Sequence, residues 1–217
     1  MKTALVFGSS GLIGGHLLNE LIQNDNYSKI KLFVRSDHGS NDSKTEIIKT
    51  DFNNLENHRE DIKGDDCFFC VGTTRQNSPD KNEYRRVELD VPKEIAQIAK
   101  SNSVNSFVFV SSGYADPKSS GDYLKFKGEV EEELKRLNFP KLRIMRPSFL
   151  LGDRKEKRVG EKIGIFVFKL LSPLFLGPLK KMKPIHSATV AKGMIAITQN
   201  DSSQTIFESN EISEIIN

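Results

Sequence analysis

The sequence predicts an α/β protein: a three-layer, doubly wound parallel sheet with helices on both faces. Short apolar runs alternate with segments of helical periodicity along the first two thirds of the chain. This alternation is typical of parallel strands joined by helices. At the start of the chain, a strand also breaks into a helix through regularly spaced glycines. Together, the alternation and the glycines favour a sheet that binds a nucleotide.

The expected elements follow from local composition and periodicity. Runs rich in Val, Ile, Leu and Phe predict strands, and apolar residues three or four apart predict helices. The predicted strands are 3–7, 30–34, 46–50, 67–71, 106–111 and 142–145, and the predicted helices are 12–24, 55–62, 83–101, 123–137 and 163–171.

A chain of 217 residues suits a single domain. After Arg146 the pattern changes to loops, Pro-rich turns and one short apolar helix, and this remainder is too small for a second domain of ordinary size. We therefore expect one domain, 1–217, in which residues 147–217 form a small cap at the carboxyl edge of the sheet, where ligands bind in such folds.

Composition excludes several classes of protein. Hydrophobic residues make up 37% and charged residues 28% of the chain, as in a soluble globular protein. A net charge of +3 and a pI near 8.7 are too mild to indicate a nucleic-acid partner. No signal peptide is visible, and no apolar run reaches the roughly 18 residues of a membrane span. We expect a cytoplasmic protein, either a monomer or a homodimer.

One apolar stretch, 163–179, is followed by Lys180, Lys181 and Lys183. Because Pro173 and Pro178 interrupt it, we expect it to pack over the site as an apolar substrate pocket or a dimer contact. Contact with a membrane surface through residues 163–183 is the alternative.

Cys67 and Cys70 form a C-x-x-C sequence on a predicted strand. A redox C-x-x-C normally begins a helix, where the thiolate is stabilised. We therefore expect two buried cysteines in a reducing compartment rather than a redox pair. The four histidines lack metal-ligand spacing, so no metal site is expected.

The glycines Gly8, Gly11 and Gly14 lie between the first strand and the first helix. They place bare backbone N–H groups at a helix N-terminus, which is a geometry that binds phosphate. Their G-x-x-G-x-x-G spacing differs from the usual G-x-G-x-x-G, so an ordinary tight turn would be the interpretation without the strand and helix around them.

A second group of residues follows the fifth predicted strand. This strand ends in Ser111 and Ser112, and Tyr123 and Lys127 lie four residues apart on the next helix. A phenol is a poor base at neutral pH unless a nearby cation favours the phenolate. Lys127 can supply this charge, and a serine hydroxyl can bind the substrate oxygen while Tyr123 transfers a proton. Without this context, the pair would be a half-buried aromatic residue beside a surface lysine.

These motifs together resemble the short-chain dehydrogenase/reductase superfamily, whose members have the Rossmann fold. The matching segments are GSSGLIGG, CVGTTR, VSSG, the Tyr123–Lys127 pair and Arg146-Pro147-Ser148. The glycine spacing and the Arg-Pro pair are similar to the extended or atypical branch. The segments CVGTTR, SSGYADPKSSGDYLKFKGEVEEEL and RPSFLLGDRKEKRVGE resemble the Tat-interacting-protein-like group, over residues 2 to about 190.

The resemblance implies a role for each matching position. Ser112, or alternatively Ser111, would be the catalytic serine, Tyr123 the acid/base, and Lys127 its partner and a ligand of the cofactor ribose. The pyrophosphate would lie against Gly8, Ser10, Gly11, Leu12, Ile13 and Gly14. The adenine would lie beside Asp51 and Phe52, the nicotinamide beside Pro147 and Ser148, and the rest of the cofactor along Cys70, Val71, Gly72, Thr73 and Ser111.

One segment departs from the family pattern. Many enzymes of the extended branch carry an asparagine in the helix after the fourth strand, where this chain reads Arg86-Val87-Glu88. A proton relay through that asparagine is therefore in doubt.

Cofactor choice depends on the residue after the second strand. NAD sites place a carboxylate there for the ribose 2′-OH, and NADP sites place a cation. This chain has Arg35, whose guanidinium suits a 2′-phosphate, so NADP is expected rather than NAD. The alternative is that Arg35 is solvated and Asp37 turns in to the ribose.

The sequence thus predicts an NADP-dependent oxidoreductase that acts on a small carbonyl or alcohol. A regulatory protein that binds NADP(H) without turnover is the alternative. Epimerase or dehydratase chemistry on a nucleotide sugar is less favoured, because the C-terminal part is short for such a substrate.

Overall fold

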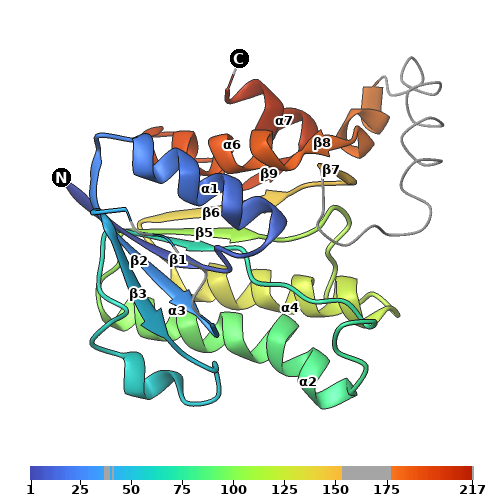
Figure 1. Cartoon of the computed structure of the whole chain (residues 1–217). Helices are drawn as coiled ribbons and strands as arrows, with labels where there is room; N and C mark the ends of the chain where they lie inside the picture. The colour runs from blue at the N-terminus through green and yellow to red at the C-terminus, as the bar shows by residue number, and fades with distance from the viewer. Residues whose placement is uncertain (37–39, 41, 153–176, 217) are drawn as a thin grey trace.

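The computed structural model describes residues 1–36, 40, 42–152 and 177–216. Its centre is a seven-stranded sheet in the order β3-β2-β1-β4-β5-β6-β9, in which every neighbouring pair is parallel (Figure 1). The predicted doubly wound parallel sheet is therefore confirmed. The strands are β1 (Lys2–Phe7), β2 (Tyr27–Val34), β3 (Thr45–Lys49), β4 (Asp66–Phe69), β5 (Ser106–Val110), β6 (Lys141–Arg146) and β9 (Ile206–Glu208).

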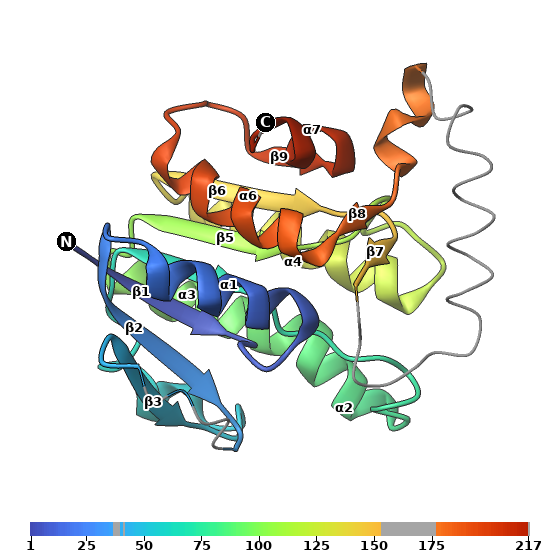
Figure 2. The same ribbon diagram turned by 45° about the horizontal axis from the view of Figure 1, so that its top comes forward.

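Helices cover both faces of the sheet. One face carries α1 (Leu12–Gln23) and α6 (Ser187–Gln199), and the other carries α3 (Val91–Ser101) and α4 (Asp122–Leu137), as Figures 1 and 2 show. The shorter elements are η1 (Leu55–His58), α2 (Lys81–Arg85), η2 (Arg86–Asp90), η4 (Gly177–Met182) and α7 (Ser209–Glu214), with a separate two-stranded sheet of β7 (Leu150–Leu151) and β8 (Ile185–His186).

Alternation along the strands divides the apolar core between the two faces. In β1, Leu5 and Phe7 belong to the cluster under α3 and α4, whereas Ala4 and Val6 belong to the cluster under α1 and α6. The Phe7 ring stacks on Phe33 with ring centroids 4.2 Å apart. Because successive strand residues point to opposite faces, a fully buried strand is apolar throughout, as the sequence predicted.

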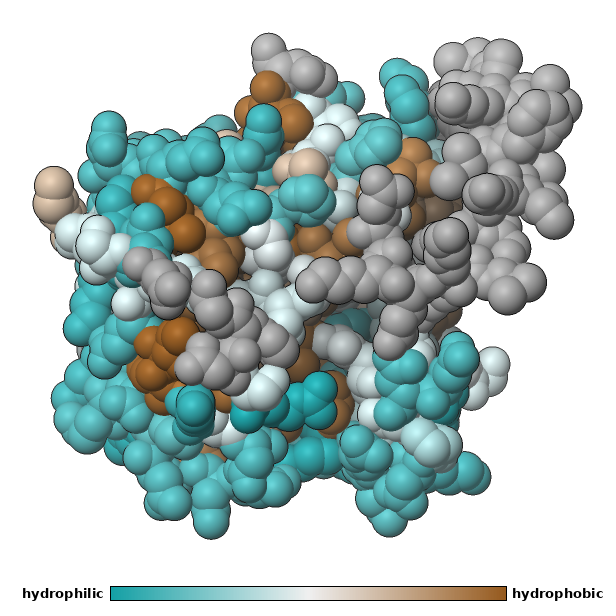
Figure 3. Space-filling view, viewed as in Figure 1, coloured by the Kyte–Doolittle hydropathy of each residue, from teal (hydrophilic) through white to brown (hydrophobic). Residues whose placement is uncertain are grey.

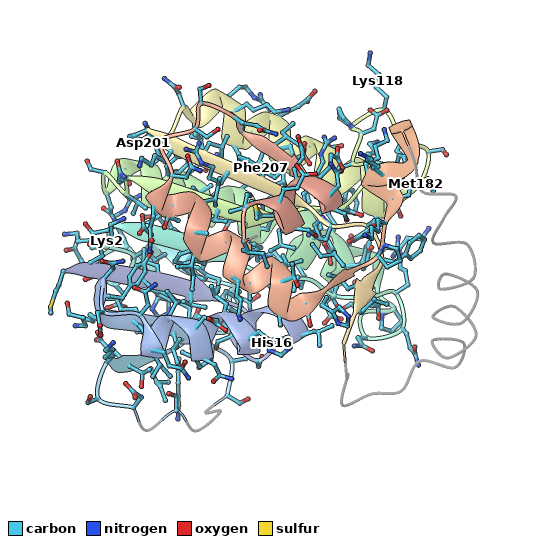
Figure 4. The ribbon with its side chains drawn as sticks, turned by 90° about the horizontal axis from the view of Figure 1, so that it is seen from above. Lys2, His16, Lys118, Met182, Asp201 and Phe207 are labelled. Carbon is cyan, nitrogen blue, oxygen red and sulfur yellow. The ribbon has the colours of Figure 1, made fainter. Side chains whose placement is uncertain are left out.

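The order of the strands defines where a ligand can bind. The chain proceeds from β1 outward through β2 and β3, and then returns to the other side of β1 with β4. At such a switch, the connections at the carboxyl ends of the two central strands run in opposite directions and leave a crevice. From above, Lys2 and Asp201 mark the end of the molecule where strands begin, and Lys118 and Met182 mark the carboxyl end (Figure 4).

The C-terminal part differs from the sequence expectation. After Arg146, the chain was expected to form loops and a cap, but β9 extends the sheet beside β6 and α6 packs against α1. The short β9 and the mixed pattern of α6 gave too weak a periodic signal. The expected helix 163–171 lies outside the described residues.

Two expected helices also differ in form. The predicted helix 83–101 is divided into α2, the π-helical turn η2 and α3, and the predicted helix 55–62 is only the 3-10 turn η1.

Within the described part of the chain, no helix has the length and apolarity to cross a membrane. The face in Figure 3 is mostly hydrophilic, with hydrophobic side chains in small separate areas.

A buried arginine fixes the connection between α6 and β9. The Arg143 side chain in β6 is 4% exposed and donates to the carbonyl groups of Asn200 and Ser202, at 3.4 and 2.7 Å. It also donates to Gln204 O at 3.3 Å. A single guanidinium thus holds the loop that leads into β9.

We predict that Arg143→Met lowers the free energy of unfolding by about 3 kcal/mol, because methionine leaves these carbonyl groups without their charged donor. Urea unfolding measures the change. Arg136→Met is the control, since Arg136 on α4 is exposed and should change stability little. Equal effects of the two substitutions would contradict this role of Arg143.

Candidate cofactor and catalytic site

The glycine turn packs tightly against the end of β4. Gly8 has a φ of +90°, and a Cβ atom there would lie 2.8 Å from the backbone of Cys70 and Val71. A Cβ atom at Gly14 would lie 2.0 Å from the carbonyl oxygen of Gly8. Only glycine fits at either position, so the backbone of the turn approaches both the strand and the helix without a side chain between them.

The same turn leaves the N-terminus of α1 open. Gly11 is the N-cap and has no side chain to cap the helix, and the first turn has no acidic residue. The N–H groups of Leu12, Ile13 and Gly14 therefore lack the intrahelical partners that later residues have. Unfilled donors and the positive end of the helix dipole attract a phosphate. The exposed Ser10 lies in this turn as well.

Three predicted residues lie at the ends of β2 and β3. Arg35 directly follows β2 and is exposed. Asp51 is exposed two residues after β3, and hydrogen bonds from Asn53 lower the pKa of its carboxyl group. Phe52 has a φ of +64° and packs partly against the core, and Arg86 binds its carbonyl oxygen at 2.5 Å. The alternative ribose ligand, Asp37, lies outside the described residues.

The two cysteines lie in and just after β4. Cys67 is buried in the strand, and the Sγ of Cys70 lies 3.9 Å from the sulfur of Met194. Both thiols are free. Burial raises the pKa of Cys70 to about 12 and raises that of Cys67 well above its usual value. Both therefore stay protonated at neutral pH, which does not suit thiolate chemistry.

The two serines after β5 have different environments. Ser111 is buried and donates to Glu131 on α4 at 2.5 Å. Glu131 in turn accepts two hydrogen bonds from Arg146, at 2.9 and 2.5 Å. Ser112 is only partly buried, and within the described part of the chain its hydroxyl makes one hydrogen bond, a long one of 3.3 Å to the carbonyl of Gly113. The hydroxyl of Ser111 is thus occupied by the scaffold, whereas that of Ser112 is held weakly.

Tyr123 and Lys127 lie on the first two turns of α4. Tyr123 is 41% exposed, whereas Lys127 is 3% exposed. The Nζ of Lys127 lies 5.9 Å from the centroid of the Tyr123 ring and 5.0 Å from that of Phe109 in β5. The helix therefore brings an accessible phenol and a buried ammonium together against the strand that ends at the serines.

The structure adds a residue that the sequence analysis did not select for the site, Glu88 in η2. Its side chain is buried, and its Oε2 pairs with the Nζ of Lys127 at 3.0 Å. Its Oε1 accepts a hydrogen bond of 2.5 Å from the N–H of Thr73. Burial acts to lower the pKa of Lys127, but the Glu88 carboxylate and the neighbouring tyrosines outweigh it, so the pKa is raised. In the sequence, the only indication of this residue was that segment 86–88 departs from the pattern of the extended branch.

Residues 147 and 148 join the site to the C-terminal part. The carbonyl of Pro147 accepts the N–H of Gly113 at 3.0 Å. The backbone N–H of Ser148 donates to the Oγ of Ser209 at 2.7 Å, and the Ser148 hydroxyl donates to Lys183 O at 2.7 Å. A hollow of about 390 Å³ lies beside these residues, between 113–117 and the side chains of Arg146, Lys181 and Glu208.

The described residues thus bring most predicted positions to one edge of the sheet. These positions follow or face the carboxyl ends of β1, β4, β5 and β6: the turn 8–14, residues 70–73, Ser112, Tyr123, Lys127 and Pro147. Among the described residues, no cluster of His, Cys, Asp or Glu is arranged to hold a metal ion. The close glycine turn and the uncapped helix fit a dinucleotide pyrophosphate.

Curated relatives share much of the chain. Protein HTATIP2 of Rattus norvegicus is 35% identical over 166 residues, which cover 74% of this chain and 67% of that protein. Protein FMP52-1, mitochondrial, of Scheffersomyces stipitis is 29% identical over 228 residues, which cover 98% of each chain. Protein FMP52, mitochondrial, of Debaryomyces hansenii is 32% identical over 158 residues, which cover 72% of this chain and 70% of that protein.

These names contradict the expected cytoplasmic location. Six fungal relatives, 28 to 32% identical to this chain, are named as mitochondrial proteins. The cytoplasmic expectation was therefore wrong; it rested on the absence of recognisable targeting signals, which composition and apolar runs detect poorly.

Solved structures and a family model agree with the fold. A UDP-N-acetylglucosamine 4-epimerase from Methanobrevibacter ruminantium M1 superposes with a TM-score of 0.71 at 18% identity, covering 99% of this chain and 81% of that chain. MoeE5 in complex with UDP-glucuronic acid and NAD superposes with a TM-score of 0.69 at 17% identity, covering 95% and 76%. The NAD(P)H-binding family model matches residues 8–201. The chain belongs to this NAD(P)H-binding family and, with its HTATIP2 and FMP52 relatives, to the atypical short-chain dehydrogenases/reductases.

Proposed function

We propose that the protein is an NADP-dependent oxidoreductase that interconverts a small carbonyl compound and its alcohol. The observation that carries this proposal is the pairing of Tyr123 with Lys127 on α4, at the same sheet edge as the glycine turn. A protein that only stored or sensed the cofactor would not need an accessible phenol beside a buried ammonium.

In the proposed reaction, the bound cofactor supplies or accepts the hydride. Tyr123 gives its phenolic proton to the carbonyl oxygen during reduction and takes it back during oxidation. Ser112 donates a hydrogen bond to the same oxygen. Lys127 stays protonated beside the phenol and donates to the ribose. Hence proton transfer depends on residues that two different elements, β5 and α4, bring together.

The remaining positions would hold the cofactor. The N–H groups at Leu12, Ile13 and Gly14 suit the pyrophosphate, together with Gly8, Ser10 and Gly11. Asp51 and Phe52 would border the adenine. The nicotinamide half of the cofactor would lie against residues 70–73 and 147–148. Ser111, whose hydroxyl is hydrogen-bonded to Glu131, would lie beside the same half.

NADP is favoured over NAD by Arg35. The guanidinium is exposed directly after β2, where the ribose of a bound dinucleotide lies in this fold. A guanidinium can form two parallel hydrogen bonds with a phosphate.

The names of the fungal relatives support a mitochondrial location for this chain. The oligomeric state and contact with a membrane surface stay predictions.

We predict that Gly14→Ala weakens NADPH binding at least about tenfold, because the new methyl group forces α1 away from Gly8. NADPH fluorescence titration measures the dissociation constant. Gly15→Ala is the matched control: its Cβ would lie 3.6 Å from Ser9 O, an ordinary contact. Similar losses in both variants would show that the close approach at Gly14 is not what matters.

We predict that Arg35→Ala weakens NADPH binding about tenfold and leaves NADH binding unchanged, since only NADPH carries the 2′-phosphate. The same titration with both cofactors tests this. Lys29→Ala, on β2 and exposed beside Glu46, should change neither. Tighter binding of NADH than of NADPH by the unaltered protein would contradict the NADP assignment.

We predict that Tyr123→Phe lowers kcat at least about a hundredfold and leaves NADPH affinity unchanged, because the phenol moves the proton and does not bind the cofactor. A panel of carbonyl compounds, with NADPH consumption as the readout, supplies the substrate. Tyr27→Phe, at the opposite end of the sheet, should keep its kcat. Turnover that survives Tyr123→Phe would overturn the mechanism and favour the regulatory alternative.

A further inference from the structure

A buried acid lies at a helical irregularity behind the catalytic pair. Between α2 and α3 the chain forms a π-helical turn, η2 (Arg86–Asp90), and Glu88 within it is 1% exposed. Single π-turns inside helices are often found at functional sites. A fully buried carboxylate is costly unless it is paired and hydrogen-bonded, so its partners indicate what it is for.

Glu88 joins three segments that meet at the site. Its Oε2 lies 3.0 Å from the Nζ of Lys127 on α4, in an ion pair rather than an aligned hydrogen bond. Its Oε1 accepts the N–H of Thr73, in the segment after β4. A Cβ atom added at Gly72 would lie 3.4 Å from this Oε1, so the backbone after β4 passes close to the carboxylate. One carboxylate thus connects the backbone that would line the cofactor to the lysine that would bind its ribose.

We propose that Glu88 is a positioning residue, which keeps the Lys127 ammonium protonated and directed into the site and holds the Thr73 backbone beside it. This inference rests on the proposed function, because the proposed function is what gives Lys127 a cofactor to bind.

The electrostatic argument follows from the groups around Lys127. The ammonium faces Glu88 from η2, Tyr84 from α2, Tyr123 from α4 and Cys70 after β4. Of these groups, Glu88 is the only carboxylate, and it lies in ion-pair contact with the ammonium. Without it, burial would dominate and lower the pKa of the lysine. A neutral amine would bind a ribose hydroxyl less strongly than an ammonium does.

Glu88→Gln tests the charge with little change of shape, since the amide oxygen can still accept the Thr73 N–H. We expect the pKa of Lys127 to fall by about one unit or more. The shift is followed by NMR of protein labelled with ¹³C-lysine, with the Lys127 signal assigned from Lys127→Met. Glu129→Gln is the control, because Glu129 lies on α4 but pairs with Lys93. An unchanged Lys127 titration in Glu88→Gln would overturn the proposal.

A second measurement separates a positioning role from a merely structural ion pair. We expect the NADPH dissociation constant of the wild type to be constant from pH 7 to pH 10. In Glu88→Gln it should rise about tenfold over this range, with a midpoint at the new Lys127 pKa. Lys127→Met should bind weakly at every pH. An NADPH affinity that does not follow the Lys127 titration would contradict the positioning role.

Glu88→Asp keeps the experiment decisive if Glu88→Gln does not fold, because aspartate retains the charge that balances the buried ammonium. We expect Lys127 to stay protonated to pH 10 in this variant, and a lowered pKa there would overturn the proposal. The lysine titration needs no substrate, so it can fail independently of the proposed function. Failure of the proposed function would appear instead as turnover that survives Tyr123→Phe.

Discussion

The close approach of the glycine turn to β4 is the constraint on which the site depends. Because Gly8 and Gly14 carry no side chains, β1, the end of β4 and the start of α1 meet through backbone alone. The same contact opens the N-terminus of α1 toward the crevice between β1 and β4. Residues 70–73, which follow β4, therefore lie beside the glycine turn. A methyl group at Gly14 would separate these elements, and every residue that depends on their spacing would shift with them.

Helix α4 adds a second constraint, which is electrostatic. Its buried face carries Lys127 and Glu131, one turn apart, and each pairs with an opposite charge from another element. Glu131 binds Arg146 and the hydroxyl of Ser111, so it links α4 to the ends of β5 and β6. Glu88 links the same helix to the segment after β4. Buried pairs of this kind contribute little net stability compared with apolar packing, but removal of one partner is costly. Their arrangement therefore specifies where the first turns of α4 lie.

The parallel sheet and its central helices could be predicted because buried strands and amphipathic helices have strong local signals. The glycine turn, Tyr123 and Lys127 could be selected because their chemistry depends on short spacings in the sequence. Glu88 could not, since its importance comes from a π-turn and from contacts with Thr73 and Lys127, which are 15 and 39 residues away. The C-terminal elements were missed for a similar reason: β9 has three residues and gains its stability from β6 and from the loop that Arg143 holds.

The two serines after β5 illustrate how the scaffold assigns roles that sequence alone leaves open. Adjacent residues at the end of a strand point to opposite sides, so only one of them can face α4 from within the core. Ser111 does so, and its short bond to Glu131 commits its hydroxyl to the same network that holds Arg146. In the proposed reaction, the Ser112 hydroxyl is then the one left to bind the substrate oxygen. The proposal of Ser112 over Ser111 thus rests on the network of Glu131, Ser111 and Arg146, which occupies the Ser111 hydroxyl.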